Sequence, residues 1–289
     1  MKQFRCLLIL FSLLLAGCTK EPVTPEAEPT GQGPTYTPRG NVAVYVDSLG
    51  VRLFRETDTV STHLCFAVYD TSGVRVKQTN QKVGDSHYGA VGFQLEDGSY
   101  RLVVVAHSSS RNPTMTDPSR IQFNNGTGYS DTYLYSTLLD VTPSQQKVHV
   151  APRRITALCR FVVGDTIPDS VATLRFRYTG GSGHFDAASG TGVTQSTQEV
   201  IRDVRPGQTD TRCDLYTFPL GTDEDTLQLT VAALNAEGGK VLERQFAVPV
   251  RCDQITWLCG NFFSTGGWTV TPATDIDSED WGSEVFLTY

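Results

Sequence analysis

A cysteine near the start of the chain is the residue whose type and surroundings most clearly indicate chemistry. Cys18 follows Leu15-Ala16-Gly17, and an apolar run over residues 7–15 leads into it. A cysteine thiol can carry a diacylglyceryl group, and small residues such as Ala16 and Gly17 fit the narrow cleft of a signal peptidase. We therefore predict cleavage after Gly17 and lipid attachment to Cys18.

The residues before this cysteine have the plan of an export signal. Lys2 and Arg5 are the only charged residues in positions 1–17, and the apolar run follows them, as in a secretory signal peptide. The run is too short to cross a bilayer, which takes about 20 apolar residues. Leu-Ala-Gly-Cys resembles the lipobox of bacterial lipoproteins, and two or more acyl chains anchor a protein stably. The alternative is an ordinary signal peptide with a chance cysteine.

The residues after Cys18 indicate whether the lipoprotein is placed in the inner or the outer membrane. In well-studied envelopes an Asp at the next position favours retention in the inner membrane, and here that position is Thr19. We therefore expect the outer membrane. Lys20-Glu21 partly matches the charged export tag of Bacteroidetes surface lipoproteins, so display on the cell surface is compatible with the sequence.

The net charge argues against one function class, nucleic-acid binding, and the length indicates the number of domains. The formal charge is -7, and loss of Lys2 and Arg5 with residues 1–17 makes it -9. An acidic chain is a poor nucleic-acid partner, because binding phosphates needs clustered Lys and Arg. The mature chain of about 270 residues is long enough for two domains.

The remaining sequence predicts a tether followed by a mainly β fold. Residues 18–40 are rich in Pro, Glu and Thr and have little to bury, so we expect a flexible tether. Beyond it, short runs rich in Val, Phe, Tyr and Thr alternate with Gly, Asp, Asn and Pro, which indicates strands and turns. No stretch has helical periodicity. We predict two tandem Greek-key β-sandwiches, an N-terminal one over 41–151 and a C-terminal one over 152–289. The predicted strands are 41–47, 64–69, 91–95, 100–107, 147–151, 155–163, 173–178, 215–219, 226–234, 240–250 and 255–263.

Other motifs that suggest chemistry have simpler explanations. Ser144 and Lys147 match the Ser-x-x-Lys spacing of penicillin-recognising enzymes, but that motif needs a helical turn and here enters a β run. The glycine-rich segments 179–183 and 189–192 precede no helix, so they fit a flexible excursion between strands better than a phosphate loop. We expect no catalytic residue.

Metal sites and disulfides are not indicated either. Acidic residues 275–280 alternate as in calcium loops, but Phe286 stands where an EF-hand would need Glu. The five histidines are scattered without zinc spacing: His63, His87, His107, His149 and His184. Five cysteines remain after Cys18. Because this number is odd, at least one thiol is unpaired. One disulfide among the others is possible. We expect no metal and no cofactor.

Several local runs together resemble one family of β proteins. These are LCFAVYD at 64–70, LEDGSYRL at 95–102, RITALCRF at 154–161 and WLCGNFF at 257–263, with Trp281 before the last strand. With the lipobox and tether, the layout over residues 41–289 is similar to the FimB/Mfa2 family of fimbrial lipoproteins from Bacteroidetes.

This resemblance implies a fold and a function. Members of the family have tandem transthyretin-like sandwiches and serve as anchoring or minor subunits of type V fimbriae. By this resemblance, lipid on Cys18 would hold the fimbria to the outer membrane, the tether would give reach, and an open sheet edge would bind neighbouring fimbrial subunits by strand addition. The terminal run 285–289 is either a strand donor or the last strand of its own domain.

Two other function classes stay open. A surface glycan-binding lipoprotein would need exposed aromatic rings, and Trp257, Trp268 and Trp281 are the only tryptophans. We expect Trp257 to lie in the core, and a small-molecule ligand is not expected. An envelope hydrolase would need acids, a Ser-His pair or a metal cluster in one cleft, and the sequence supplies no such set.

Overall fold

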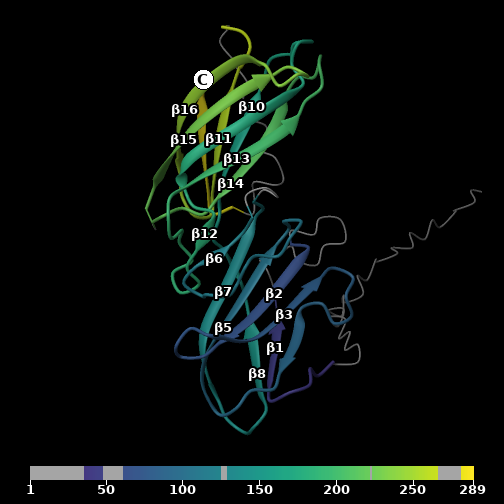
Figure 1. The fold of residues 1–289 in the computed structure, drawn as a ribbon, viewed down its shortest axis with the longest axis vertical. Coiled ribbons are helices and arrows are strands. Elements are labelled where there is room, and N and C mark those ends of the chain that lie inside the picture. The colour runs from purple at the N-terminus through teal and green to yellow at the C-terminus, as the bar shows by residue number, and fades with distance from the viewer. Residues whose placement is uncertain (1–35, 48–60, 125–128, 222, 266–280) are drawn as a thin grey trace, which may run out of the picture. The chain divides into compact units, whose positions relative to one another are not determined.

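The computed structural model describes residues 36–47, 61–124, 129–221, 223–265 and 281–289. Within these ranges the chain forms eighteen strands and no helix (Figure 1). The prediction of a mainly β protein is therefore confirmed. Cys18 and residues 19–35 of the predicted tether lie outside the described residues.

The first sandwich packs a three-stranded sheet against a five-stranded sheet. In the smaller sheet the order is β4-β1-β8, and β1 is antiparallel to β4 and parallel to β8. In the larger sheet the order is β3-β2-β5-β7-β9, and every pair is antiparallel. The strands are β1 (Val42–Val46), β2 (His63–Tyr69), β3 (Arg75–Lys82), β4 (Ala90–Phe93), β5 (Gly98–His107), β7 (Thr132–Val141), β8 (Gln146–Val150) and β9 (Arg153–Arg154).

The second sandwich packs two four-stranded sheets. One, here called the β10 sheet, has the order β14-β10-β17-β18, in which β10, β17 and β18 are parallel. The other, the β11 sheet, has the antiparallel order β13-β11-β15-β16. The strands are β10 (Ala157–Val163), β11 (Thr173–Gly181), β13 (Ser196–Asp203), β14 (Thr211–Thr217), β15 (Asp225–Leu234), β16 (Lys240–Val250), β17 (Gln254–Gly260) and β18 (Ser283–Thr288).

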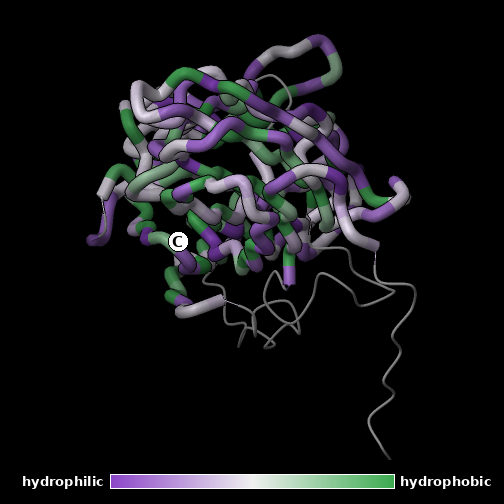
Figure 2. Tube along the Cα trace, turned by 90° about the horizontal axis from the view of Figure 1, so that it is seen from below, coloured by the Kyte–Doolittle hydropathy of each residue, from purple (hydrophilic) through white to green (hydrophobic). Residues whose placement is uncertain are grey.

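Apolar and polar residues alternate along the strands, and this alternation determines which face of each sheet lies in the core of its sandwich. Figure 2 shows hydrophobic and hydrophilic residues following one another along the tube. In β11, for example, Leu174, Phe176 and Tyr178 are buried between the sheets, while Arg175 and Arg177 point to the outer face. Successive side chains of a strand point to opposite faces, so one sheet supplies both a core face and a solvent face.

Short strands connect the two sandwiches. β6 (Ile121–Gln122) pairs with β12 (His184–Phe185), and these strands lie far apart in the sequence. β9 pairs with β7 of the first sandwich, immediately before β10 begins the second. The domain boundary at residues 151 and 152 stays a prediction.

Candidate functional site

The free edge of β3 is the candidate partner-binding strand of the first sandwich. Among the described residues, β3 pairs only with β2. Val83 N donates to Thr62 O at 2.8 Å, and hydrogen-bonded pairs alternate with non-bonded pairs along an antiparallel ladder. The peptide groups of Thr79 therefore face β2, while those of Gln78 and Asn80 face outward. Outward N–H and C=O groups in a row are what an added strand binds.

The side chains around β3 suit a partner that arrives from solution. Val74, Val76 and Val83 are 59%, 39% and 46% exposed, and they lie within this strand or beside it. Arg75, Lys77 and Lys82 make the strand basic. Charged side chains on an edge discourage unspecific pairing between identical chains, whereas exposed valines add apolar contact once a strand is in place.

The C-terminal run, predicted as either a donor or a last strand, is the last strand of its own sheet. β18 runs parallel to β17, with Phe286 opposite Trp257. The Tyr289 ring stacks on Phe161 with ring centroids 5.1 Å apart, and its hydroxyl donates to Val162 O at 3.0 Å. Its aromatic contacts reach the core of the second sandwich, so this strand completes the sandwich that carries it.

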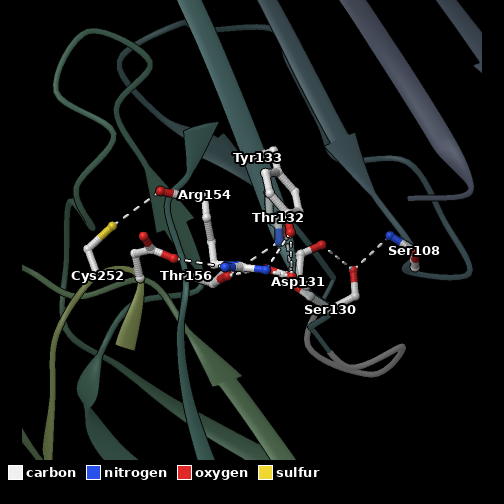
Figure 3. A network of polar contacts seen from close by, with 9 residues as sticks. Ser108, Ser130, Asp131, Thr132, Tyr133, Arg154, Thr156 and Cys252 are labelled. Carbon is white, nitrogen blue, oxygen red and sulfur yellow. Dashed lines mark hydrogen bonds and ion pairs between the residues drawn. The ribbon is translucent and has the colours of Figure 1, made fainter. Parts of the chain in front are cut away.

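A buried arginine ties the two sandwiches together (Figure 3). Arg154 Nε donates to both carboxylate oxygens of Asp131, at 2.9 and 3.0 Å, and one Nη donates to Asp253 Oδ1 at 2.8 Å. Asp131 lies just before β7, and Asp253 lies in the turn between β16 and β17. The guanidinium lies 3.8 Å from the ring centroid of Trp281. One cation thus joins the first sandwich, the second sandwich and the residue that leads into β18.

The electrostatics of this network favour a permanent charge. The Arg154 side chain is only 6% exposed. Burial alone lowers its pKa, but attraction to Asp131 and hydrogen bonds to Asp131 and Asp253 outweigh burial, so the net pKa of Arg154 is raised. Thr156 Oγ1 also donates to Asp131 Oδ1 at 3.0 Å, which satisfies more of the carboxylate. A buried charge that is paired in this way costs far less than an unpaired one.

An apolar cluster accompanies the arginine at the junction. The rings of Phe123, Phe185 and Phe218 pack together, with centroids 4.8 Å apart for Phe185 and Phe218 and 6.0 Å apart for Phe123 and Phe218. They join a buried cluster that includes Tyr69 of β2 and Val103 of β5. Because these residues come from both sandwiches, the junction buries apolar surface as a core does.

The glycine-rich segments belong to this junction, so the interpretation as a flexible excursion is wrong. A Cβ on Gly181 would lie 2.0 Å from Thr217 Oγ1, and one on Gly192 would lie 2.6 Å from Ser182 Cβ. Gly180 has φ of +99°, which side-chain-bearing residues rarely adopt. These glycines allow close packing. A run of glycines alone could not distinguish this role from flexibility.

A thiol and an imidazole meet inside the first sandwich, but the pair is inert. Cys65 Sγ lies 3.7 Å from His107 Nε2, and both residues are fully buried. Burial raises the pKa of Cys65 to about 12. Burial and the neighbouring His63 lower the pKa of His107 to about 4. The nucleophile of such a pair is the thiolate, and here the thiol keeps its proton.

The other sequence candidates do not assemble a site within the described ranges. Ser144 lies in an exposed bend before β8, and Lys147 lies in that strand, so they share no helical turn. Among the described residues, no group of three His, Cys, Asp or Glu residues could hold a metal ion. The acidic run 275–280 lies outside the described residues. All five described cysteines are free thiols. No described helix is long and apolar enough to cross a membrane.

Trp257 is buried and Trp281 is partly buried, and other side chains pack on both. Trp257 is 2% exposed, which confirms its predicted core position, and its ring stacks on Phe286 with centroids 5.7 Å apart. Trp281 packs on Arg154 and Tyr216. Trp268 lies outside the described residues. The two described tryptophans therefore do not form an exposed platform for sugar rings.

Comparison with known proteins gives one family. The model for fimbrillin-A associated anchor proteins Mfa1 and Mfa2 matches residues 55–247, more than half of the chain. A candidate adhesin from Bacteroides ovatus is 16% identical, with a TM-score of 0.50 over 71% of this chain and 81% of that chain. This likeness supports the β-sandwich fold.

Two more solved structures are similar at lower TM-scores. The fimbrial anchor protein Mfa2 from Porphyromonas gingivalis is 13% identical, with a TM-score of 0.38 over 71% of this chain and 81% of that chain. A candidate polysaccharide-binding protein from Bacteroides thetaiotaomicron is 11% identical, with a TM-score of 0.45 over 71% and 80% of the two chains. No curated protein matches the sequence.

Proposed function

Because the chain belongs to the family of fimbrillin-A associated anchor proteins, we propose that it holds a type V fimbria to the outer membrane and binds the neighbouring subunit by strand addition. The family makes it a fimbria-associated protein of the cell envelope or surface. Its family is one of fimbrial anchor proteins, not of enzymes. Three parts of the proposal go beyond membership of the family. They are the lipid on Cys18, the role as an anchoring or minor subunit, and the strand edge that binds the neighbouring subunit.

The free edge of β3 is the observation that carries the binding mode. It is an eight-residue strand paired on one side, with outward peptide groups and exposed valines. The last strand, β18, is instead already packed in its own sandwich. The chain therefore acts as an acceptor at β3 and keeps β18 for itself, a division of roles that suits a subunit at one end of a fimbria.

The tether gives this acceptor its distance from the membrane. Cys18 and Tyr36 are separated by 17 residues, which at full extension span at most roughly 60 Å. At the folded end, Arg39 and Gly40 run against β4, where a Cβ on Gly92 would lie 2.0 Å from Arg39 O. A pull on the lipid would thus reach the first sandwich, which is also the one that carries β3.

The lipid is tested by a Cys18→Ala strain that is labelled metabolically with an alkyne fatty acid. We expect label on the wild-type protein in the outer-membrane fraction, and no label and fimbriae shed into the medium for the variant. Unchanged labelling and retained fimbriae would contradict lipid anchoring.

Strand addition is tested by proline on the free edge. Gln78→Pro removes an outward N–H but leaves the β2 ladder intact, and proline is tolerated on edge strands. We expect capture of the fimbrial subunit to fall at least about tenfold, because the variant loses one hydrogen bond to the added strand and its edge is distorted. The matched control is Ile201→Pro on β13, an edge strand of the second sandwich. Equal capture by both variants would rule out β3 as the acceptor.

A further inference from the structure

The outer face of the β11 sheet carries a polar trough unrelated to the β3 edge. Its volume is about 390 Å³, and it lies where the outer face of β15 has small side chains, Thr230 and Ala232, between longer ones on the flanking strands. A second hollow of about 280 Å³ shares Gln228 and Thr230 and extends it toward β16. The first is lined by Arg175, Arg177, Tyr178, Thr179, Thr197, Gln228, Thr230, Ala232 and Glu243.

Two arginines on one strand dominate the charge of this trough. Arg175 and Arg177 are two residues apart on β11 and point to the same face, so their Cα atoms are about 7 Å apart. Within the described part of the chain neither guanidinium has an ion-pair or hydrogen-bond partner, although Glu199 of β13 lies opposite Arg177 in the sheet. Arg154 and Arg160, by contrast, each pair with an Asp. Adjacent unpaired cations on an acidic chain form a site for an anion, and guanidinium groups bind carboxylates in a bidentate manner.

The rest of the lining selects the kind of anion. Thr179, Thr230 and Gln228 offer neutral donors and acceptors. Glu243, whose Oε1 accepts from Lys240 Nζ at 3.1 Å, offers a carboxylate two strands away from Arg175, roughly 10 Å across the sheet. Sugar hydroxyls donate to such a carboxylate and bond to the neutral groups. Tyr178, the only aromatic residue of the lining, is 1% exposed, so ring stacking does not contribute.

We infer that this trough binds a carboxylated sugar, with its carboxylate on Arg175 and Arg177 and its hydroxyls on Gln228, Thr230 and Glu243. The inference does not rest on the fimbrial role, since it uses the opposite sandwich from β3. The carboxylate can belong to a uronic acid within a polysaccharide or to a sialic acid at the end of a glycan. Both present a carboxylate beside ring hydroxyls.

The test is isothermal titration calorimetry of the full-length lipoprotein in detergent. The probes are a galacturonate trisaccharide and sialyllactose, with the methyl ester of the first and lactose as their uncharged counterparts. We expect at least one acidic probe to bind and its uncharged counterpart to bind at least about tenfold more weakly, because a charged hydrogen bond is lost. The probe that binds identifies the source of the carboxylate.

Variants locate the binding. Arg175→Gln and Arg177→Gln should each weaken binding at least about tenfold, while Arg205→Gln, an exposed arginine in the turn after β13, should not change it. Equal thermal unfolding of the three variants shows that the fold is retained. The inference is overturned if neither acidic sugar binds at millimolar concentration, if an oligoglutamate peptide binds in their place, or if all three variants bind alike.

Discussion

At the scale of single residues, buried polar groups carry the strongest constraints in this protein. Arg154 and His107 are both nearly inaccessible, but their environments differ. Arg154 is charged and paired with two carboxylates, whereas His107 is neutral and packed against His63 and Phe123. Neither role could be read from the sequence, because partners such as Asp131 and Asp253 become neighbours only in the folded sheets.

Removal of the Arg154 side chain should destabilise the protein strongly. Arg154→Ala leaves Asp131, whose side chain is 13% exposed, without its cation, and breaking a buried pair of this kind costs about 3 kcal/mol. Lys240→Ala removes the exposed pair with Glu243 and should cost less than about 1 kcal/mol. Urea unfolding measures both. Similar losses in the two variants would mean that Arg154 does not tie the sandwiches together.

His107 should make the protein less stable in mild acid. Its pKa is lowered to about 4 in the fold, below the usual value of 6.5, so the unfolded chain binds a proton first as the pH falls. The stability that neutral His107 supports is complete above pH 6.5 and declines toward pH 4. By linkage the loss is about 2 kcal/mol at pH 5 relative to pH 8.

Denaturant titrations of variants at the two pH values test this effect. His107→Gln should reduce the difference between the free energies of unfolding at pH 8 and pH 5. The explanation fails if His107→Gln retains the full pH dependence.

At the scale of elements, the sequence predicts buried strands well and polar edges poorly. β2, β10 and β17 are mostly apolar and are buried along almost their whole length, and the sequence predicts all three. The edge strands β3 and β13 have polar sequences, RVKQTNQK and STQEVIRD, and both were missed. An edge strand buries little, so it carries no hydrophobic pattern, yet β3 is the strand that matters for binding.

β7 was missed for a different reason. Its sequence, TYLYSTLLDV, is rich in strand-forming residues but has no clean alternation, because apolar residues occur on both faces of the strand. Tyr133 and Leu139 face the core of the first sandwich, and Leu138 lies on the other face. Leu138 is 70% exposed, so an apolar residue stands at a solvent-facing position and obscures the period of two in the sequence. Propensity would have found this strand where pattern did not.

β18 should behave as a separable last strand. A chain that ends at Gly282 loses the contacts of Tyr289 with Phe161 and Phe246, so it should be less stable by several kcal/mol and should bind hydrophobic dyes. A synthetic peptide of residues 283–289 should restore the wild-type unfolding temperature, while a scrambled peptide should not. A truncated chain as stable as the full one would show that β18 is not part of the sandwich.

At the scale of the whole molecule, the proposed anchor has its membrane end and its partner end on the first sandwich. The tether enters beside β4, and β3 is an edge of the facing sheet. The second sandwich is linked through Arg154, the phenylalanine cluster and the paired strands β6 and β12. It is free to present other surfaces, among them the polar trough of the β11 sheet.

The central claim is that β3 receives a strand from the adjoining fimbrial subunit, and site-specific photo-crosslinking in fimbriated cells tests it most directly. A photoreactive amino acid replaces Gln78 on β3 and, in separate strains, Ile201 on β13 and Phe286 on β18. We predict a crosslinked adduct with the fimbrial subunit from position 78 and none from position 201 or 286. An adduct from either of these positions with none from position 78 would contradict the proposal.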